Sequence, residues 1–154
     1  MSLEFRPVTL DNCESLIDLQ VREDQRDFVA SNLYSIAESK FGVEDEGHWD
    51  LFPYGLYVDG KPVGFAMTGL NLDHPRRQGL ILRLMVDERY QGMGYGREAM
   101  QVMVDMFRAE ARVKALMISY EPENDVARKL YANFGFIETG EMIDHEVVAE
   151  LRLR

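Results

Sequence analysis

The stretch that decides the fold covers residues 80–97 and reads LILRLMVDERYQGMGYGR. Its apolar beginning is typical of a strand that is buried on both faces at the centre of a sheet. Three glycines then follow a charged turn and open a long helical pattern, so the first N–H groups of that helix stay free to face a ligand. Free amides and the helix dipole together favour a phosphate or pyrophosphate at this point.

The chain length and composition indicate one globular domain over residues 1–154. With 154 residues and 46% hydrophobic content, there is room for a single core and no second domain. No apolar stretch is long enough to cross a bilayer, and the N-terminus lacks the pattern of a signal peptide. We therefore expect a cytoplasmic protein that has no membrane partner.

The charge and the metal-binding residue types narrow the possible partners. A formal net charge of −10 would repel nucleic acid phosphates, so we expect no nucleic acid partner and favour cationic ones. The acidity could also serve solubility alone. The single cysteine, Cys13, excludes an internal disulfide and a thiolate-rich metal site. His48, His74 and His145 lie far apart in the sequence, so no metal is expected.

The order of predicted elements indicates a mixed α/β sheet flanked by helices. Strands are expected at residues 3–8, 54–58, 63–70, 80–86, 115–119, 136–142 and 145–153. Helices are expected after a cap at Thr9 or Asp11, then at residues 24–40, 94–112 and 125–134. Asp59-Gly60 predicts a hairpin turn, and the acidic residues 43–53 lack periodicity and are predicted to form a loop. The predicted order contains both antiparallel and parallel strand pairs.

Two common phosphate-binding motifs do not fit the glycines. A P-loop needs Gly-Lys-Ser/Thr at the helix start, whereas Gly96 precedes Arg97-Glu98 and offers no hydroxyl for magnesium. A dinucleotide site needs its glycines early in a repeating βαβ array, whereas this chain offers two candidate crossover helices after a hairpin.

Two motifs resemble those of the GNAT superfamily of N-acetyltransferases. Gln91, Gly94 and Gly96 match the signature Gln/Arg-x-x-Gly-x-Gly/Ala after the expected strand. Residues 124–136, NDVARKLYANFGF, resemble the family's second helix, and the matching positions are Asn124, Ala127, Leu130, Tyr131, Gly135 and Phe136. The predicted order of elements agrees with the family fold across nearly the whole chain.

This resemblance implies that acetyl-CoA binds where the central strand splays from the next parallel strand. Backbone groups of Leu84, Met85 and Val86 are then expected to pair with the pantetheine arm, as an added strand would. The pyrophosphate is expected on the loop and helix start, at Gln91, Gly92, Met93, Gly94, Tyr95, Gly96 and Arg97. Asn124 and Tyr131 complete the expected cofactor-binding set.

Acetyl transfer to an amine needs a proton acceptor and a partner for the leaving thiolate. A primary amine of pKa about 10.4 is protonated at pH 7. Removing its proton to give the neutral nucleophile costs about 4–5 kcal/mol at this pH. Glu121 and Glu123 could accept the proton, directly or through water, or could only complement the dipole of the next helix. The resemblance gives Tyr131 the catalytic role toward the thiolate. A phenol of pKa about 10 is a weaker acid than a thiol of about 8.5, so a hydrogen bond is the expected form of this help.

The acceptor amine is suggested by a finer resemblance. Residues 8–32, 56–70 and 135–141 look like bacterial spermine/spermidine acetyltransferases of the small diamine type. The chain departs from them at Leu82, where a carboxylate often precedes the arginine that matches Arg83. Carboxylates and aromatic faces suit a polyamine, and the candidate residues are Glu23, Asp24, Tyr34 and Trp49, with Asp27 and Glu38.

Other activities and assemblies remain open from the sequence. The acceptor could instead be a peptide N-terminus, an aminoglycoside or a small amino compound. The chain could also be a non-catalytic acyl-CoA-binding sensor. A homodimer through the last strands is a further possibility.

Overall fold

A computed structural model gives the structure of the protein and describes residues 2–28 and 30–154. The strands are β1 Glu4–Pro7, β2 Val43–Glu44, β3 His48–Val58, β4 Lys61–Leu70, β5 Gly79–Val86, β6 Ala115–Tyr120, β7 Ile137–Ile143 and β8 Glu146–Arg152. The helices are α1 Cys13–Ile17, α2 Asn32–Ser39, α3 Tyr95–Ala109 and α4 Asp125–Asn133, with short 3₁₀ helices η1 Glu23–Phe28 and η2 Glu88–Tyr90.

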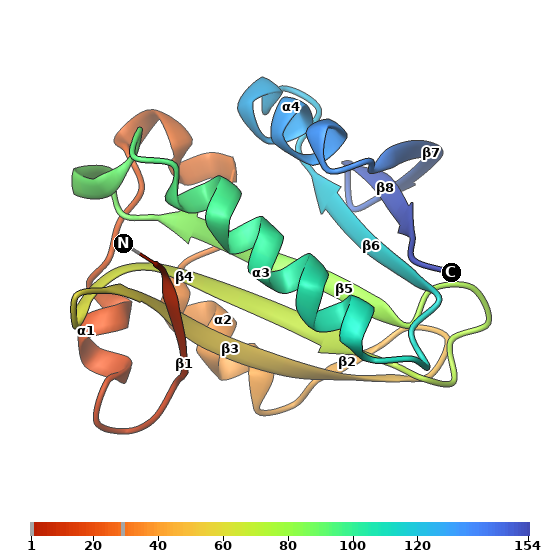
Figure 1. Ribbon diagram of the computed structural model, residues 1–154, viewed down its shortest axis with the longest axis horizontal. Helices are drawn as coiled ribbons and strands as arrows, with labels where there is room; N and C mark the ends of the chain where they lie inside the picture. The colour runs from red at the N-terminus through yellow and green to blue at the C-terminus, as the bar shows by residue number, and fades with distance from the viewer. Residues whose placement is uncertain (1, 29) are drawn as a thin grey trace.

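One mixed sheet organises the molecule, and the expected α/β class is confirmed (Figure 1). Its strand order is β1-β3-β4-β5-β6-β8-β7, and β2 pairs with β3 beside this path. The β5 and β6 strands are parallel, whereas the other strand pairs are antiparallel. The strand at residues 80–86 therefore lies at the centre of the sheet, as its apolar sequence predicts.

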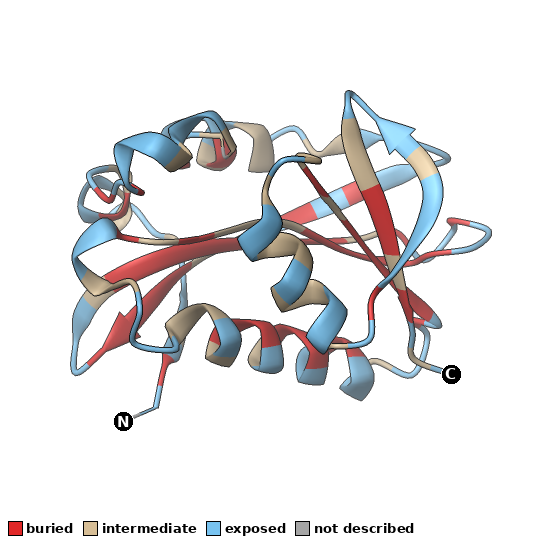
Figure 2. Ribbon diagram, turned by 90° about the horizontal axis from the view of Figure 1, so that it is seen from above, coloured by how far each residue is buried: buried red, intermediate tan, exposed pale blue. Residues whose placement is uncertain are grey.

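Helices cover both faces of the sheet, and Figure 2 shows buried residues gathered between the layers. Side chains of α3 and α4 pack on one core cluster, and those of α1 and α2 pack on a second. Met100 and Met103 of α3 face the sheet and are completely buried. We call these two sides of the sheet the α3–α4 face and the α1–α2 face.

The predicted helix at residues 24–40 is wrong in one respect, because it forms two separate helices. Ser31 takes an extended conformation (φ −63°, ψ 152°), and its hydroxyl accepts a hydrogen bond from the Tyr34 N–H. This side-chain cap starts a new helix and so interrupts the earlier one. Val29, which belongs to the predicted helix, lies outside the described residues.

The predicted loop at residues 43–53 is also wrong. Apart from the turn around Glu46 and Gly47, it forms β2 and the first half of β3. Trp49 and Leu51 are buried whereas the residues beside them are exposed, so the segment alternates with a period of two. Because the segment is rich in acidic residues, its alternating strand pattern was not recognised from the sequence.

Smaller differences concern the ends of helices. Asn12, not Thr9 or Asp11, occupies the N-cap position of α1. The α3 helix ends at Ala109, three residues before the predicted end, because Glu110 is extended. The hairpin turn at Asp59-Gly60 is confirmed, with φ of 51° and 76°. Among the described residues, no helix is long and apolar enough to span a bilayer.

Candidate active site

The two central parallel strands separate halfway along their length. Pairing between β5 and β6 is confined to Gly79–Leu116, Leu80–Met117 and Ile81–Ile118. Beyond these pairs β5 continues to Val86 and β6 to Tyr120. The expected splay is therefore present, and it opens a gap at the centre of the sheet.

A β-bulge at Leu82 accompanies the separation. Met67 of β4 pairs with Arg83 and Thr68 pairs with Ile81, so Leu82 is an extra residue in β5. Such a bulge bends the strand and changes the alternation of side chains. As a result Arg83 reaches α2, where its guanidinium donates to Ser35 at 3.1 Å and pairs with Glu38 at 3.2 Å.

A cavity of about 960 Å³ occupies the gap and is lined from both faces of the sheet. The α3–α4 face contributes Gly94, Tyr95, Gly96, Asn124, Leu130 and Tyr131. The α1–α2 face contributes Tyr34, Glu38, Trp49, Met117, Ser119 and Glu146. The cavity therefore connects the two sides of the sheet, so that two ligands could meet in the gap.

The free edge of β5 offers backbone groups at alternate residues. The Asp87 N–H donates to the Val63 carbonyl at 2.8 Å, and the Met85 carbonyl lies against Gly64 of β4. Because successive backbone groups of a strand point in opposite directions, those of Leu84 and Val86 face the gap. The expectation that Met85 also pairs with a ligand arm is wrong for its backbone, since that backbone faces β4. Met85 is nevertheless among the residues that line the cavity.

The glycine loop has the geometry of an anion site. Gly92 and Gly94 have φ of 79° and 86°, a region that favours glycine, and a Cβ on either would point into open space. Gly94 caps α3, whose first helical bond runs from the Glu98 N–H to the Gly94 carbonyl at 3.0 Å. The amides before Glu98 therefore lack helical acceptors and can bind a pyrophosphate.

Most of the predicted loop residues line the cavity. They are Gln91, Gly92, Gly94, Tyr95 and Gly96. Gln91 also donates from Nε2 to the Val86 carbonyl at 2.9 Å, which fixes the loop to the end of β5. Met93 and Arg97 are exposed and lie outside the lining. The open glycine cradle, the free amides and the unpaired strand edge fit the diphosphate and the amide-bearing arm of coenzyme A.

Tyr131 lies on α4 and faces the cavity. The Asn124 side chain caps this helix by accepting from the Ala127 N–H at 3.2 Å. The Tyr131 ring packs against Tyr120, with ring centroids 5.4 Å apart. Burial, the nearby carboxylate of Glu146 and Tyr120 raise the pKa of Tyr131 to about 12. The phenol therefore remains a neutral hydrogen-bond donor at physiological pH.

The predicted substrate residues are only partly brought together. Asp24, Tyr34 and Trp49 line the cavity, whereas Glu23 does not. Trp49 is 1% exposed, and its Nε1–H donates to the Asp45 carbonyl at 3.0 Å. It therefore anchors the β2–β3 hairpin as well as lining the wall.

Sequence reasoning missed several polar residues of the cavity. Asp45, Ser119, Asp144 and Glu146 line it together with Glu121 and Glu123, which were considered as bases. The alternating pattern around Trp49 could have revealed Asp45. Asp144 comes from the β7–β8 turn and Glu146 from the first position of β8, and nothing in their local sequence indicates that they approach the gap.

The cavity is strongly acidic. Nine carboxylates line it, against two arginines, Arg22 and Arg83. Six of the nine have no cation within 4.0 Å in the part of the chain that the structure describes, and these are Asp27, Asp45, Glu121, Glu123, Asp144 and Glu146. This wall would attract a ligand that carries several positive charges.

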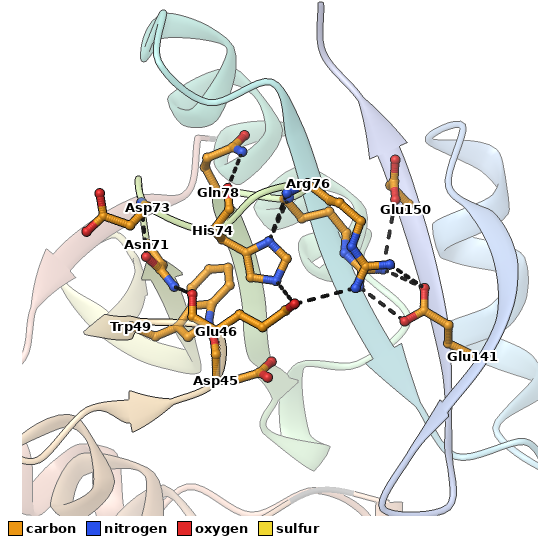
Figure 3. A network of polar contacts seen from close by, with 11 residues as sticks. Asp45, Glu46, Trp49, Asn71, Asp73, His74, Arg76, Gln78, Glu141 and Glu150 are labelled. Atoms are coloured by element: carbon orange, nitrogen blue, oxygen red, sulfur yellow. Dashed lines mark hydrogen bonds and ion pairs between the residues drawn. The ribbon is translucent and has the colours of Figure 1, made fainter.

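A network of polar contacts lies next to Asp45 and Trp49, two residues that line the cavity (Figure 3). His74 packs against Trp49, and its Nε2 lies 2.9 Å from a Glu46 oxygen. Because His74 Nδ1 accepts the N–H groups of Arg76 and Arg77, its proton sits on Nε2. Arg77 also pairs with Glu141 of β7 through two bonds of 3.1 and 3.3 Å. The network therefore joins the β2–β3 hairpin to β7.

The structure offers no cluster of three or more His, Cys, Asp or Glu side chains arranged to hold a metal, as far as residues 2–28 and 30–154 are concerned. The chemistry available in the gap comes from Tyr131, the carboxylates and the backbone groups described above.

Comparisons with known proteins agree with this geometry. Residues 13–136 match the family model described as acetyltransferase (GNAT) family. A spermine/spermidine N(1)-acetyltransferase of Bacillus subtilis (strain 168) is 33% identical over 146 residues, which cover 92% of each chain.

Solved structures show the same fold. An aminoglycoside acetyltransferase AAC(6')-Ib in complex with coenzyme A superposes with a TM-score of 0.74 at 17% identity, covering 98% of this chain and 95% of that one. A structure of AAC(6')-Ib with acetyl-CoA gives a TM-score of 0.73 at 15% identity and covers 99% and 94%.

Proposed function

The chain belongs to the acetyltransferase (GNAT) family and is an acetyl-CoA-dependent N-acetyltransferase, and we propose that its acceptor is a primary amine of a polyamine such as spermidine or spermine. The observation that carries the proposal is the excess of carboxylates in the cavity, nine against two arginines. The name of the relative at 33% identity points to the same class of acceptor.

Electrostatics favours an acceptor with several charges over one with a single charge. Two unit charges 4 Å apart near a protein surface attract each other by about 4 kcal/mol before desolvation is subtracted. A monoamine can use one such contact, whereas a polyamine can use several of the six unpaired carboxylates. These six carboxylates come from several separate segments of the chain, from Asp27 of η1 to Glu146 of β8.

The cofactor is proposed to bind on the α3–α4 face. The backbone groups of Leu84 and Val86 would pair with the pantetheine arm, and the amides that follow Gly94 would hold the pyrophosphate. The hydroxyl of Tyr131 would donate a hydrogen bond to the sulfur of the leaving thiolate. Its raised pKa makes full proton loss from the phenol unfavourable, so the hydrogen bond is the contribution that we assign to it.

The test is a thiol-release assay with acetyl-CoA and a panel of amines. Spermidine and spermine are compared with an aminoglycoside, a peptide N-terminus and a small amino compound. We expect kcat/KM for spermidine or spermine to exceed that for the other amines by tenfold or more. Preference for another amine would contradict the polyamine proposal, and tight CoA binding without any thiol release would favour a sensor.

A further inference from the structure

Glu146 is a carboxylate of the cavity wall with an unusual position. It is the first residue of β8, and its Oε1 accepts a hydrogen bond of 2.7 Å from the hydroxyl of Ser119 on β6. It has no cation within 4.0 Å among the described residues. Both Glu146 and Ser119 line the cavity. Ser119 therefore fixes one carboxylate oxygen and leaves the other available to a ligand.

The alternation of strands places this pair opposite Tyr131. On β6, Ile118 and Tyr120 belong to the core under α3, so Ser119 between them points to the α1–α2 face. On β8, Val148 belongs to the core of the α1–α2 face, and Glu146 shares its side. Tyr131 approaches the same cavity from the α3–α4 face.

We propose that Glu146, held by Ser119, is the general base that takes the proton from the acceptor ammonium on the α1–α2 face, opposite Tyr131. This inference rests on the proposed function, since it assigns a residue to the same acetyl transfer. Ser119 is a positioning residue in this scheme.

The step balances in atoms and charge. The ammonium gives one proton to Glu146, and the freed nitrogen lone pair attacks the thioester carbonyl carbon. The C–N bond forms, the C–S bond breaks, and the nitrogen gives up its second proton. One of the two protons passes to solvent through Glu146, and the other ends on the CoA sulfur, to which Tyr131 is hydrogen-bonded. The products are the acetylated amine and the thiol.

Glu121 and Glu123 are less suited to this role. Both lie in the segment between β6 and the N-terminus of α4, where they complement the positive end of the helix dipole. The titratable groups that line the cavity on β6, on α4 and in the segments next to these elements and β8 are Tyr120, Glu121, Glu123, Asp125, Tyr131 and Asp144. Glu146 alone among the carboxylates of this wall lies on a strand and is hydrogen-bonded by Ser119.

The test is the pH dependence of turnover in Glu146→Gln. General-base catalysis typically contributes 10²–10⁴-fold, so we expect kcat to fall by about 100-fold or more at pH 7. The loss should shrink by about tenfold for each pH unit toward the pKa of the amine, because the variant depends on amine that is already neutral. Glu146→Asp should recover part of the rate. Ser119→Ala should lose about fivefold, and Ser119→Thr should restore it.

Matched controls separate this role from a structural one. Glu150 lies on the same strand and face but outside the cavity, so Glu150→Gln should keep kcat within about twofold. The Kd of acetyl-CoA should stay within about twofold in Glu146→Gln, which shows that the site remains folded.

Each outcome decides the proposal. Unchanged kcat and pH profile in Glu146→Gln would overturn it, as would the pH-dependent loss appearing in Glu121→Gln or Glu123→Gln instead. If the wild-type protein acetylates a different amine, the polyamine proposal fails and the same variants are tested on that amine. Failure of wild-type thiol release with every amine would overturn both proposals.

Discussion

Two acidic regions of this molecule use the same side chains in opposite ways. In the network of Figure 3, Glu46 faces His74 and Arg76, and Glu141 faces Arg77. In the cavity, six of nine lining carboxylates have no cation within 4.0 Å among the described residues. Unpaired carboxylates close together repel one another, whereas removing one member of a buried pair is costly. The contrast assigns stability to the network, and under the proposed function it assigns binding of the cationic acceptor to the cavity.

The largest effect on stability is expected from Glu141→Ala in the network. Arg77 is 2% exposed. The change removes the Glu141 carboxylate that accepts two hydrogen bonds from it, so that Glu150, 3.9 Å away, becomes its nearest carboxylate. Only Arg77 is buried in this pair, since Glu141 is 39% exposed, so we expect a loss of about 1–3 kcal/mol from the buried donor groups that the change leaves unsatisfied. Denaturant unfolding of the variant measures the loss, and a change below about 1 kcal/mol would show that the network does not hold the fold.

Tyr131→Phe tests the catalytic side of the comparison. The change removes the hydroxyl but keeps the ring contacts with Tyr120 and Phe136. We expect kcat to fall by about 100-fold, or about 3 kcal/mol in activation free energy, with the Kd of acetyl-CoA nearly unchanged. Steady-state kinetics and calorimetry give the two numbers, and an unaltered kcat would remove Tyr131 from the mechanism.

The double variant Asp45→Asn with Asp144→Asn should weaken binding of the acceptor amine without lowering the stability of the fold. Losing two unpaired charges is expected to raise KM for spermidine by about tenfold, which corresponds to about 1.4 kcal/mol. The unfolding free energy should stay the same or rise, because repulsion in the cavity is relieved. A clear loss of stability would mean that these carboxylates have structural partners, and the contrast with Glu141 would fail.

The smallest effect concerns the pH dependence of stability. The hydrogen bond from Arg77, with the charges of Arg77 and Arg76, lowers the pKa of Glu141. A lowered folded-state pKa contributes stability that is complete above the unfolded value of about 4.3 and is lost as pH falls through the folded value. Because Glu141 is 39% exposed, solvent screening keeps the effect small. Unfolding free energies at pH 6 and pH 3 should differ less in Glu141→Gln than in the wild type.

Local sequence was sufficient for the elements that are proposed to bind the cofactor. The glycines between Gln91 and Gly96 and the Asn124 cap act within a few residues of their own positions, so their geometry is readable from the motif. The central strand and α3 are also locally coded, through an apolar run and a helical stripe that ends in Phe107.

The acceptor side could not be predicted in the same way. The bulge at Leu82 leaves no mark in a strand that is apolar on both sides, yet it turns Arg83 toward α2. Glu146 reaches the gap through the pairing of β8 with β6. Its proximity to Tyr131 is a property of the assembled sheet, and its neighbours in sequence carry no signal for it.

The central claim is that unpaired carboxylates select an acceptor with several charges. The most direct measurement is the ratio of kcat/KM for spermidine to that for butylamine, which carries a single amine on the same four-carbon arm, in the wild type and in Asp45→Asn with Asp144→Asn. We expect a wild-type ratio of about 100 or more, equivalent to about 2.7 kcal/mol, and a fall of at least about tenfold in the variant. A wild-type ratio near one, or a ratio that the double variant leaves unchanged, would contradict it.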